Sequence, residues 1–190
     1  MSSPAPDSAV AGVALPPPAQ LAGSWRRDLR ANGFAPTASG ALRAWFLSPA
    51  FKLLVLHRWA AKAHLGGRVS RLLSRLAWRW SVASSACYLS PLADIAPGLS
   101  LPHPTGIVVG EGVQIGADST IYQNVTIGRA RVSDGSYPVL GHSVTIYAGA
   151  VIVGNVRIGD GATIAANAVV LKDVPAGATA VGAPARILPT

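Results

Sequence analysis

The sequence contains one cysteine, Cys87, so no disulfide can form within the chain. A reducing cytoplasm is the expected compartment for such a protein. Half of the residues are apolar, yet there is no uncharged apolar run of about 18 residues, which argues against a membrane-spanning helix. The first residues also lack a basic stretch followed by an apolar core, so a secretory signal is not expected.

Acidic residues are nearly absent from the first half. Residues 1–90 hold 11 Lys and Arg but only Asp7 and Asp28, whereas residues 91–190 hold 5 Lys and Arg against 6 Asp and Glu. All 5 tryptophans also lie in the first half. The chain therefore consists of two chemically different parts that meet near residue 88. Because no nucleic-acid-binding motif accompanies the basic half, a nucleic-acid partner is not expected.

The basic half divides into a tail and a helical region. Residues 1–22 are mostly Pro, Ala and Ser, which predicts a disordered tail. Residues 23–87 are expected to be helical, with Ser48 capping a helix and Gly66 and Gly67 ending it. Apolar residues then recur at helical spacing: Phe51, Leu54, Val55, Trp59 and Ala60. A second helix carries arginines on one side, at Arg68, Arg71, Arg75 and Arg79.

Two interpretations of residues 23–87 are open. In the first, Trp and Leu pack against the second half and between subunits while the arginines face water. In the second, the region makes a peripheral membrane contact, with tryptophans at the interface and arginines on anionic lipid. The second interpretation would hold the protein at the inner face of the membrane.

Residues 88–190 follow a period of six. Aliphatic residues recur at this interval, and a small or β-branched residue stands four positions after each; the clearest run is Ile146, Ile152, Ile158, Ile164 and Val170. The register slips by two residues between Ile107 and Val109. A period of six fits neither a helix nor an ordinary strand. It indicates a solenoid of triangular coils, three hexads to a turn, with the recurring aliphatics inside.

The repeat is interrupted once, from residue 128 to 139, "GRARVSDGSYPV". A solenoid accommodates an insertion as an outward loop at a corner. Such loops on a rigid scaffold often carry binding groups.

The repeats resemble the hexapeptide-repeat acyltransferases, and most closely their serine acetyltransferase branch. The segments that carry the resemblance are "HPTGIVVGEGVQIG", "QNVTIG", "VIVGNVRIGDGATIAANAVVLKDVP" and "VGAPARI". The resemblance implies a mainly β fold, a left-handed parallel β-helix preceded by a short helical region. It also implies acetyl-CoA as co-substrate, active sites between neighbouring subunits, and assembly as trimers or dimers of trimers, of which the homotrimer is expected here. Acetyl transfer from a thioester to an alcohol requires no metal.

The resemblance assigns residues to the site. His103 falls on the family's catalytic histidine and Glu111 on an active-site glutamate. Ala148, Ala166 and Pro175 fall on positions that line the path of the cofactor, and Arg186 lies in the tail near it.

Other positions depart from the family pattern. Pro102 replaces the aspartate before the histidine, and Tyr88 replaces the aspartate that orients its ring. Ser136 and Tyr137 replace the arginine and the second histidine that hold the acceptor. Tyr137 can bond an acceptor hydroxyl or only pack in the loop. Arg129 and Arg131 can meet CoA phosphates or only solubilise the loop.

His103 lies between Pro102 and Pro104, which restrict its backbone. A neutral histidine near pH 7 suits the general base that takes a proton from an alcohol, a role worth about 10²–10⁴-fold in rate. A backbone N–H after Ile127 is the simplest donor to the oxyanion. His57, His64 and His142 are expected to be structural or solvated, and Cys87 a packing residue.

Three functions are therefore in competition. The first is an acetyl-CoA-dependent O-acetyltransferase that modifies a sugar hydroxyl during surface polysaccharide assembly, because the acceptor side of the site departs most from the family. The second is a true serine O-acetyltransferase. The third is a non-catalytic β-helix that serves as a scaffold.

Overall fold

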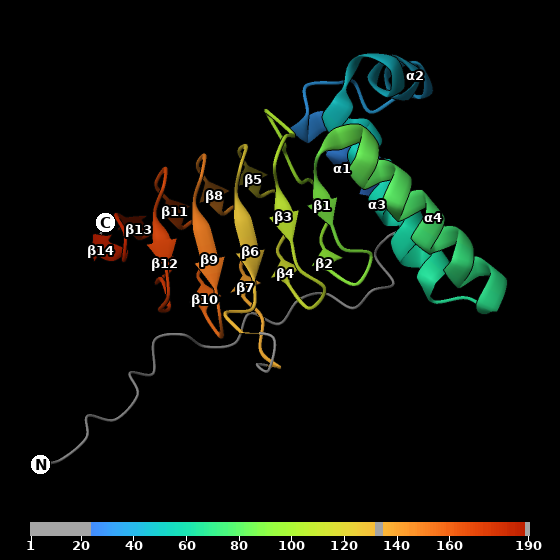
Figure 1. The fold of residues 1–190 in the computed structure, drawn as a ribbon. Coiled ribbons are helices and arrows are strands. Elements are labelled where there is room, and N and C mark those ends of the chain that lie inside the picture. Colours follow the sequence, from blue (N-terminus) through green and yellow to red (C-terminus); the bar gives the residue numbers. More distant parts are fainter. Residues whose placement is uncertain (1–23, 132–134, 189–190) are drawn as a thin grey trace, which may run out of the picture.

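The computed structural model describes residues 24–131 and 135–188. They form an N-terminal group of helices followed by a row of short strands that leads away from it (Figure 1). The helices are α1 (Ser24–Ala31), α2 (Ala38–Leu47), α3 (Pro49–His64) and α4 (Arg68–Ser85). The tail predicted for residues 1–22 lies outside the described residues. No helix in the described ranges is long and apolar enough to cross a bilayer.

The strands stack into a three-sided solenoid. Its first face holds β1 (Tyr88–Leu89), β3 (Val108–Val109), β6 (Thr126–Gly128), β9 (Val151–Val153) and β12 (Val169–Val170). The second face holds β2 (Asp94–Ile95), β4 (Gln114–Ile115), β7 (Val139–Leu140) and β10 (Arg157–Ile158). The third holds β5 (Thr120–Ile121), β8 (Thr145–Ile146), β11 (Thr163–Ile164), β13 (Thr179–Val181) and β14 (Arg186–Leu188).

The six-residue period produces this core directly. In the typical two-residue strand the first side chain faces outward and the second, an aliphatic, is buried. Equivalent aliphatics from successive coils pair in register, as Ile121, Ile146 and Ile164 do on the third face. Each is fully buried, so every coil shields the core of the next.

The two ends of the solenoid are closed differently. At the N-terminal end Leu53 and Leu54 of α3 join the same core as Leu89 of β1. At the C-terminal end β14 folds back antiparallel to β13. The helix thus closes the apolar core at one end, and β14 pairs with the edge of β13 at the other.

The predicted helix boundaries agree with the structure. The Ser48 side chain accepts a hydrogen bond from the Phe51 N–H, and Pro49 begins α3. One member of the apolar stripe is not buried, because Trp59 is 48% exposed. The side of α3 that carries Leu53 and Leu54 packs on the first coil, and the ring of Trp59 lies at the surface.

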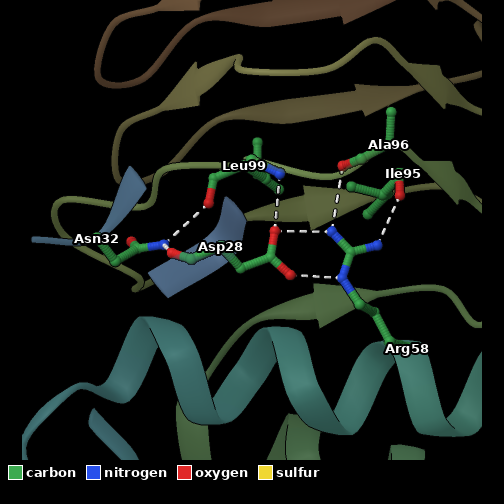
Figure 2. A network of polar contacts seen from close by, with 7 residues as sticks. Asp28, Asn32, Arg58, Ile95, Ala96 and Leu99 are labelled. Carbon is green, nitrogen blue, oxygen red and sulfur yellow. Dashed lines mark hydrogen bonds and ion pairs between the residues drawn. The ribbon is translucent and has the colours of Figure 1, made fainter. Parts of the chain in front are cut away.

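A buried polar network joins the helices to the first coil (Figure 2). The Arg58 guanidinium of α3 forms two bonds to the Asp28 carboxylate of α1, at 2.6 and 2.9 Å. Arg58 also donates to the carbonyls of Ile95 and Ala96, and Asp28 accepts from the Gly98 N–H. The network fixes the segment that precedes His103 against the helices.

Candidate functional site

The solenoid has three corners, and the candidate residues are distributed over all of them. The histidine corner joins the third face to the first and comprises residues 102–107, 122–125, 147–150 and 165–168. The glutamate corner joins the first face to the second and includes residues 110–113, 129–131, 135–138 and 154–156. The remaining corner joins the second face to the third.

His103 lies where the six-residue register slips. The corner between Leu101 and Val109 is two residues longer than its equivalent between Ile121 and Ile127. The extra length lifts the exposed His103 out of the regular coil, between Pro102 and Pro104. The two extra residues that break the six-residue register therefore position His103, the candidate base.

Two tyrosines continue the histidine corner into the next coils. The ring centre of Tyr122 lies 6.2 Å from that of His103, and the rings of Tyr122 and Tyr147 stack at 5.1 Å. Sequence reasoning missed both. The signal was available, because each tyrosine directly follows a core isoleucine of the hexad.

The predicted cofactor positions are placed unevenly. Ala148 and Ala166 occupy equivalent positions in successive coils of the histidine corner, as the register of β8 and β11 requires. Both therefore lie on the same edge of the solenoid as His103. Pro175 lies at the third corner, and Arg186 begins β14 at the far end. One chain does not bring these last two beside His103.

Charged residues gather at the glutamate corner. The Tyr137 hydroxyl donates to Glu111 Oε1 at 2.8 Å, and the Arg129 guanidinium lies 3.7 Å from the same oxygen. Arg129 also lies over the Tyr137 ring, 5.7 Å from its centre. The Tyr137 ring fills the space beside Gly112, where a Cβ would fall 2.2 Å from it. The hydrogen bond to Glu111 raises the pKa of Tyr137, with desolvation adding to the effect.

The glutamate corner and His103 are separated within one chain. They lie at opposite ends of β3, one on each side of the first face. The backbone after Ile127, predicted to hold the oxyanion, belongs to the glutamate corner as well. A site that uses both corners therefore needs a second copy of the chain.

The replacement of the orienting aspartate has a visible consequence. Tyr88 packs edge-to-face on Trp78 of α4, with ring centres 4.9 Å apart. Among the described contacts of Tyr88 there is none with His103, so the ring packs the helices onto the first coil instead.

A pocket of about 400 Å³ borders both prolines beside His103. Its polar lining includes Asn32, Ser48 and Ser100. The Asn32 side chain is engaged by Leu99 and Leu101, and Ser48 caps α3. The lining of this pocket contains no charged side chain.

Three other titratable side chains, His57, His142 and Cys87, are engaged within the fold. His57 is buried and donates through Nε2 to the Ser90 carbonyl at 2.9 Å, and desolvation lowers the pKa of His57 to about 4. His142 Nδ1 accepts from the Ala117 N–H. Cys87 is buried, which raises the pKa of its thiol. Within residues 24–131 and 135–188, no cluster of three or more His, Cys, Asp or Glu could hold a metal ion.

Comparison with known proteins gives a consistent result. Residues 137–172 match the family described as bacterial transferase hexapeptide (six repeats). The serine acetyltransferase of Mycobacterium tuberculosis is 37% identical over 86% of this chain and 71% of its own length. The chain spans 52% of one curated relative that it matches and 89% of another.

Solved structures agree with these relatives. The serine acetyltransferase of Neisseria gonorrhoeae in complex with serine has a TM-score of 0.79 and 30% identity, over 90% of this chain and 70% of that one. A serine acetyltransferase in complex with CoA has a TM-score of 0.74 and 31% identity, over 87% of this chain and 68% of that one. The fold that the family resemblance implied, a left-handed parallel β-helix behind a helical region, is confirmed.

Proposed function

Because the chain belongs to the serine acetyltransferase family of hexapeptide-repeat transferases, an acyltransferase family that uses acetyl-CoA, we propose that it transfers the acetyl group to L-serine. The sequence alone favoured a sugar hydroxyl. The relatives and structures described above are serine acetyltransferases, and they support the second of the competing functions instead.

The observation that carries this proposal is the charge pair at the glutamate corner. Serine is a zwitterion, and its ammonium and carboxylate require partners of opposite sign. Glu111 and Arg129 lie 3.7 Å apart and both remain partly exposed. Arg129 would bind the carboxylate and Glu111 the ammonium, in place of the basic groups missing at Ser136 and Tyr137. A neutral sugar would require no such pair.

The site forms between two subunits of a homotrimer. One subunit supplies His103 and the edge with Ala148 and Ala166, along which the pantetheine arm of CoA lies. Its neighbour supplies Glu111, Arg129 and Tyr137. We place the assembly in the cytoplasm, in keeping with the single buried thiol of Cys87.

The reaction needs one proton shuttle. His103 takes the hydroxyl proton of serine while the oxygen attacks the thioester carbon. A backbone N–H of the glutamate corner stabilises the oxyanion of the tetrahedral intermediate. The carbon–sulfur bond then breaks, and the imidazolium returns its proton to the CoA thiolate. O-acetylserine and free CoA leave.

The test follows release of free thiol from acetyl-CoA with L-serine, nucleotide sugars and oligosaccharides as acceptors. We expect turnover with L-serine alone, and a 10²–10⁴-fold loss of kcat for His103→Ala. Turnover with a sugar but not with serine would contradict the proposal and identify a sugar hydroxyl as the acceptor. If no acceptor supports turnover and CoA does not bind, the chain is a scaffold.

Arg129→Gln separates the two roles open for that residue. Loss of a carboxylate partner raises KM for serine, by about tenfold or more, and leaves KM for acetyl-CoA unchanged. A rise in KM for acetyl-CoA instead would assign Arg129 to the CoA phosphates. Arg131→Gln, in the same loop, is the matched control.

A further inference from the structure

Helix α4 has polar residues where a packed helix usually has apolar ones. Ser74 Oγ donates to the Ala60 carbonyl of α3 at 2.8 Å, and Ser70 Oγ donates to the Ala63 carbonyl at 2.6 Å. The large apolar side chains lie on another side of the helix and are 48–73% exposed: Val69, Leu72, Leu73, Leu76 and Trp80. Helices normally bury this kind of stripe.

These five residues form a single stripe. Their spacing follows the helical repeat, so at 100° per residue they fall within an arc of about 100°. Four exposed arginines lie along the adjacent side of the helix: Arg68, Arg71, Arg75 and Arg79. We call the apolar stripe and these arginines the α4 face.

The apolar surface continues beyond α4. A groove of about 420 Å³ is lined by Trp80 of α4 and by Phe46 and Leu47 of α2. Phe46 is 73% exposed and Leu47 is 66% exposed. The same groove reaches Pro104, next to His103. The apolar stripe of the α4 face is thus part of a larger surface shared by two helices.

The surface charge of the helices has one sign only. Asp28 is the only acidic residue between 24 and 87, and it is 1% exposed beneath Arg58. No exposed carboxylate is therefore available among the described helices to neutralise the arginines of the α4 face. A second copy docked on this face would bring arginines against arginines without counter-charges.

An anionic lipid surface satisfies both halves of the α4 face. Lipid phosphates pair with arginine, and the boundary of the acyl chains accepts leucine, valine and tryptophan side chains. Helices that lie in a membrane interface combine an apolar side with a basic side in this way. We propose that the protein binds peripherally to anionic bilayers through the α4 face, with α4 parallel to the membrane plane.

The test is sedimentation of the full chain with vesicles of phosphatidylcholine alone and of phosphatidylcholine with phosphatidylglycerol. We expect binding to the anionic vesicles only, weakened by salt. Each arginine near such a surface contributes about fivefold in partitioning, so Arg71→Gln, Arg75→Gln and Arg79→Gln together lower it on the order of a hundredfold. Leu72→Gln with Leu76→Gln is expected to lower it at least tenfold.

Arg157→Gln with Lys172→Gln, exposed basic residues of the solenoid, is the matched control and should bind as wild type does. Circular dichroism and acetyl-CoA turnover confirm that each variant is folded. The proposal is overturned if wild-type protein stays in the supernatant with anionic vesicles at low salt. Unchanged binding of the leucine variant also overturns it. So does an assembly of twice the expected mass that Leu76→Gln halves, because a second copy then covers the face.

Discussion

The solenoid and the helical region differ in how regularly they bury their side chains. Inside the solenoid, coil after coil buries the same aliphatic positions, and Ile127, Ile146 and Ile158 are fully enclosed. The helical region buries Asp28, His57 and Ser74, while leucines of α4 remain exposed. In the solenoid, the six-residue repeat therefore determines which side chains are buried. In the helical region no such repeat determines it.

The difference shows where each part derives its stability. A coil of the solenoid shares its contacts with two nearly identical neighbours, so the loss of one contact is local. The helical region depends on contacts that occur once, such as the Asp28–Arg58 pair that bonds to Gly98, Ile95 and Ala96. Single substitutions should therefore distinguish the two regions.

The largest effect is expected at Arg58. Arg58→Met leaves the Asp28 carboxylate buried without its partner, which costs about 3–5 kcal/mol of unfolding free energy. Urea unfolding measures the loss. Arg157→Met, which changes an exposed arginine of the solenoid, should stay within about 0.5 kcal/mol of wild type. A loss below about 1 kcal/mol for Arg58→Met would show that the pair does not hold the helices.

A matched pair of truncations gives the next effect. Ile146→Ala in the solenoid opens a cavity among fully buried neighbours and should cost about 3 kcal/mol. Leu72→Ala on α4 removes a side chain that is 55% exposed and should cost less than about 0.5 kcal/mol. The same urea experiment measures both. Equal losses would contradict the contrast between the two regions.

Acid should weaken the helical region through His57. Its folded pKa of about 4 lies below the unfolded value near 6.5, so only the unfolded chain takes up this proton between these pH values. Unfolding free energy therefore falls as pH falls from about 6.5 to about 4, by up to about 3 kcal/mol. His57→Gln should flatten that slope in unfolding measured at several pH values, and His64→Gln should not. A slope unchanged by His57→Gln would refute this origin.

The smallest effects concern backbone conformation. Ala86 ends α4 with φ of 54°, and Asn167 turns the histidine corner with φ of 58°. Only glycine, asparagine and aspartate visit this region readily. Ala86→Gly should raise the unfolding free energy by about 1 kcal/mol, and Asn167→Ala should lower it by a similar amount. Thermal unfolding detects both, and effects of the opposite sign would contradict the argument.

The solenoid could be predicted from the sequence because its rule is local and repeated. The aliphatic positions, the corners and the slip at His103 all follow from counting in sixes. The resemblance then supplied chemical roles that spacing alone does not carry, and these roles remain proposals for His103 and Glu111. The position of Glu111 at another corner follows from the topology, but only once the faces are assigned to strands.

The helical region resisted prediction for the opposite reason. One of the two open interpretations had Trp and Leu of residues 23–87 packing against the second half of the chain. In α4, however, serines make the hydrogen bonds to α3. Trp59 belongs to the predicted apolar stripe of α3, yet it is half exposed. The one signal for the buried network was that Asp28 is the only acidic residue among the basic residues of the helices. A single carboxylate in such a region indicates an ion pair, but it does not say with which arginine.

The number of coils fixes the length of the histidine corner. Each coil adds one strand spacing, about 4.8 Å, to the length of this corner. The distance from His103 past Ala148 to Ala166 can therefore change only by whole multiples of that spacing. The dimensions of a flexible pocket can change by fractions of an ångström over evolutionary time, whereas the length of the histidine corner cannot. A chain that gained or lost one entire turn would still close its prism, but the edge that we propose for the pantetheine arm would be longer or shorter by one strand spacing.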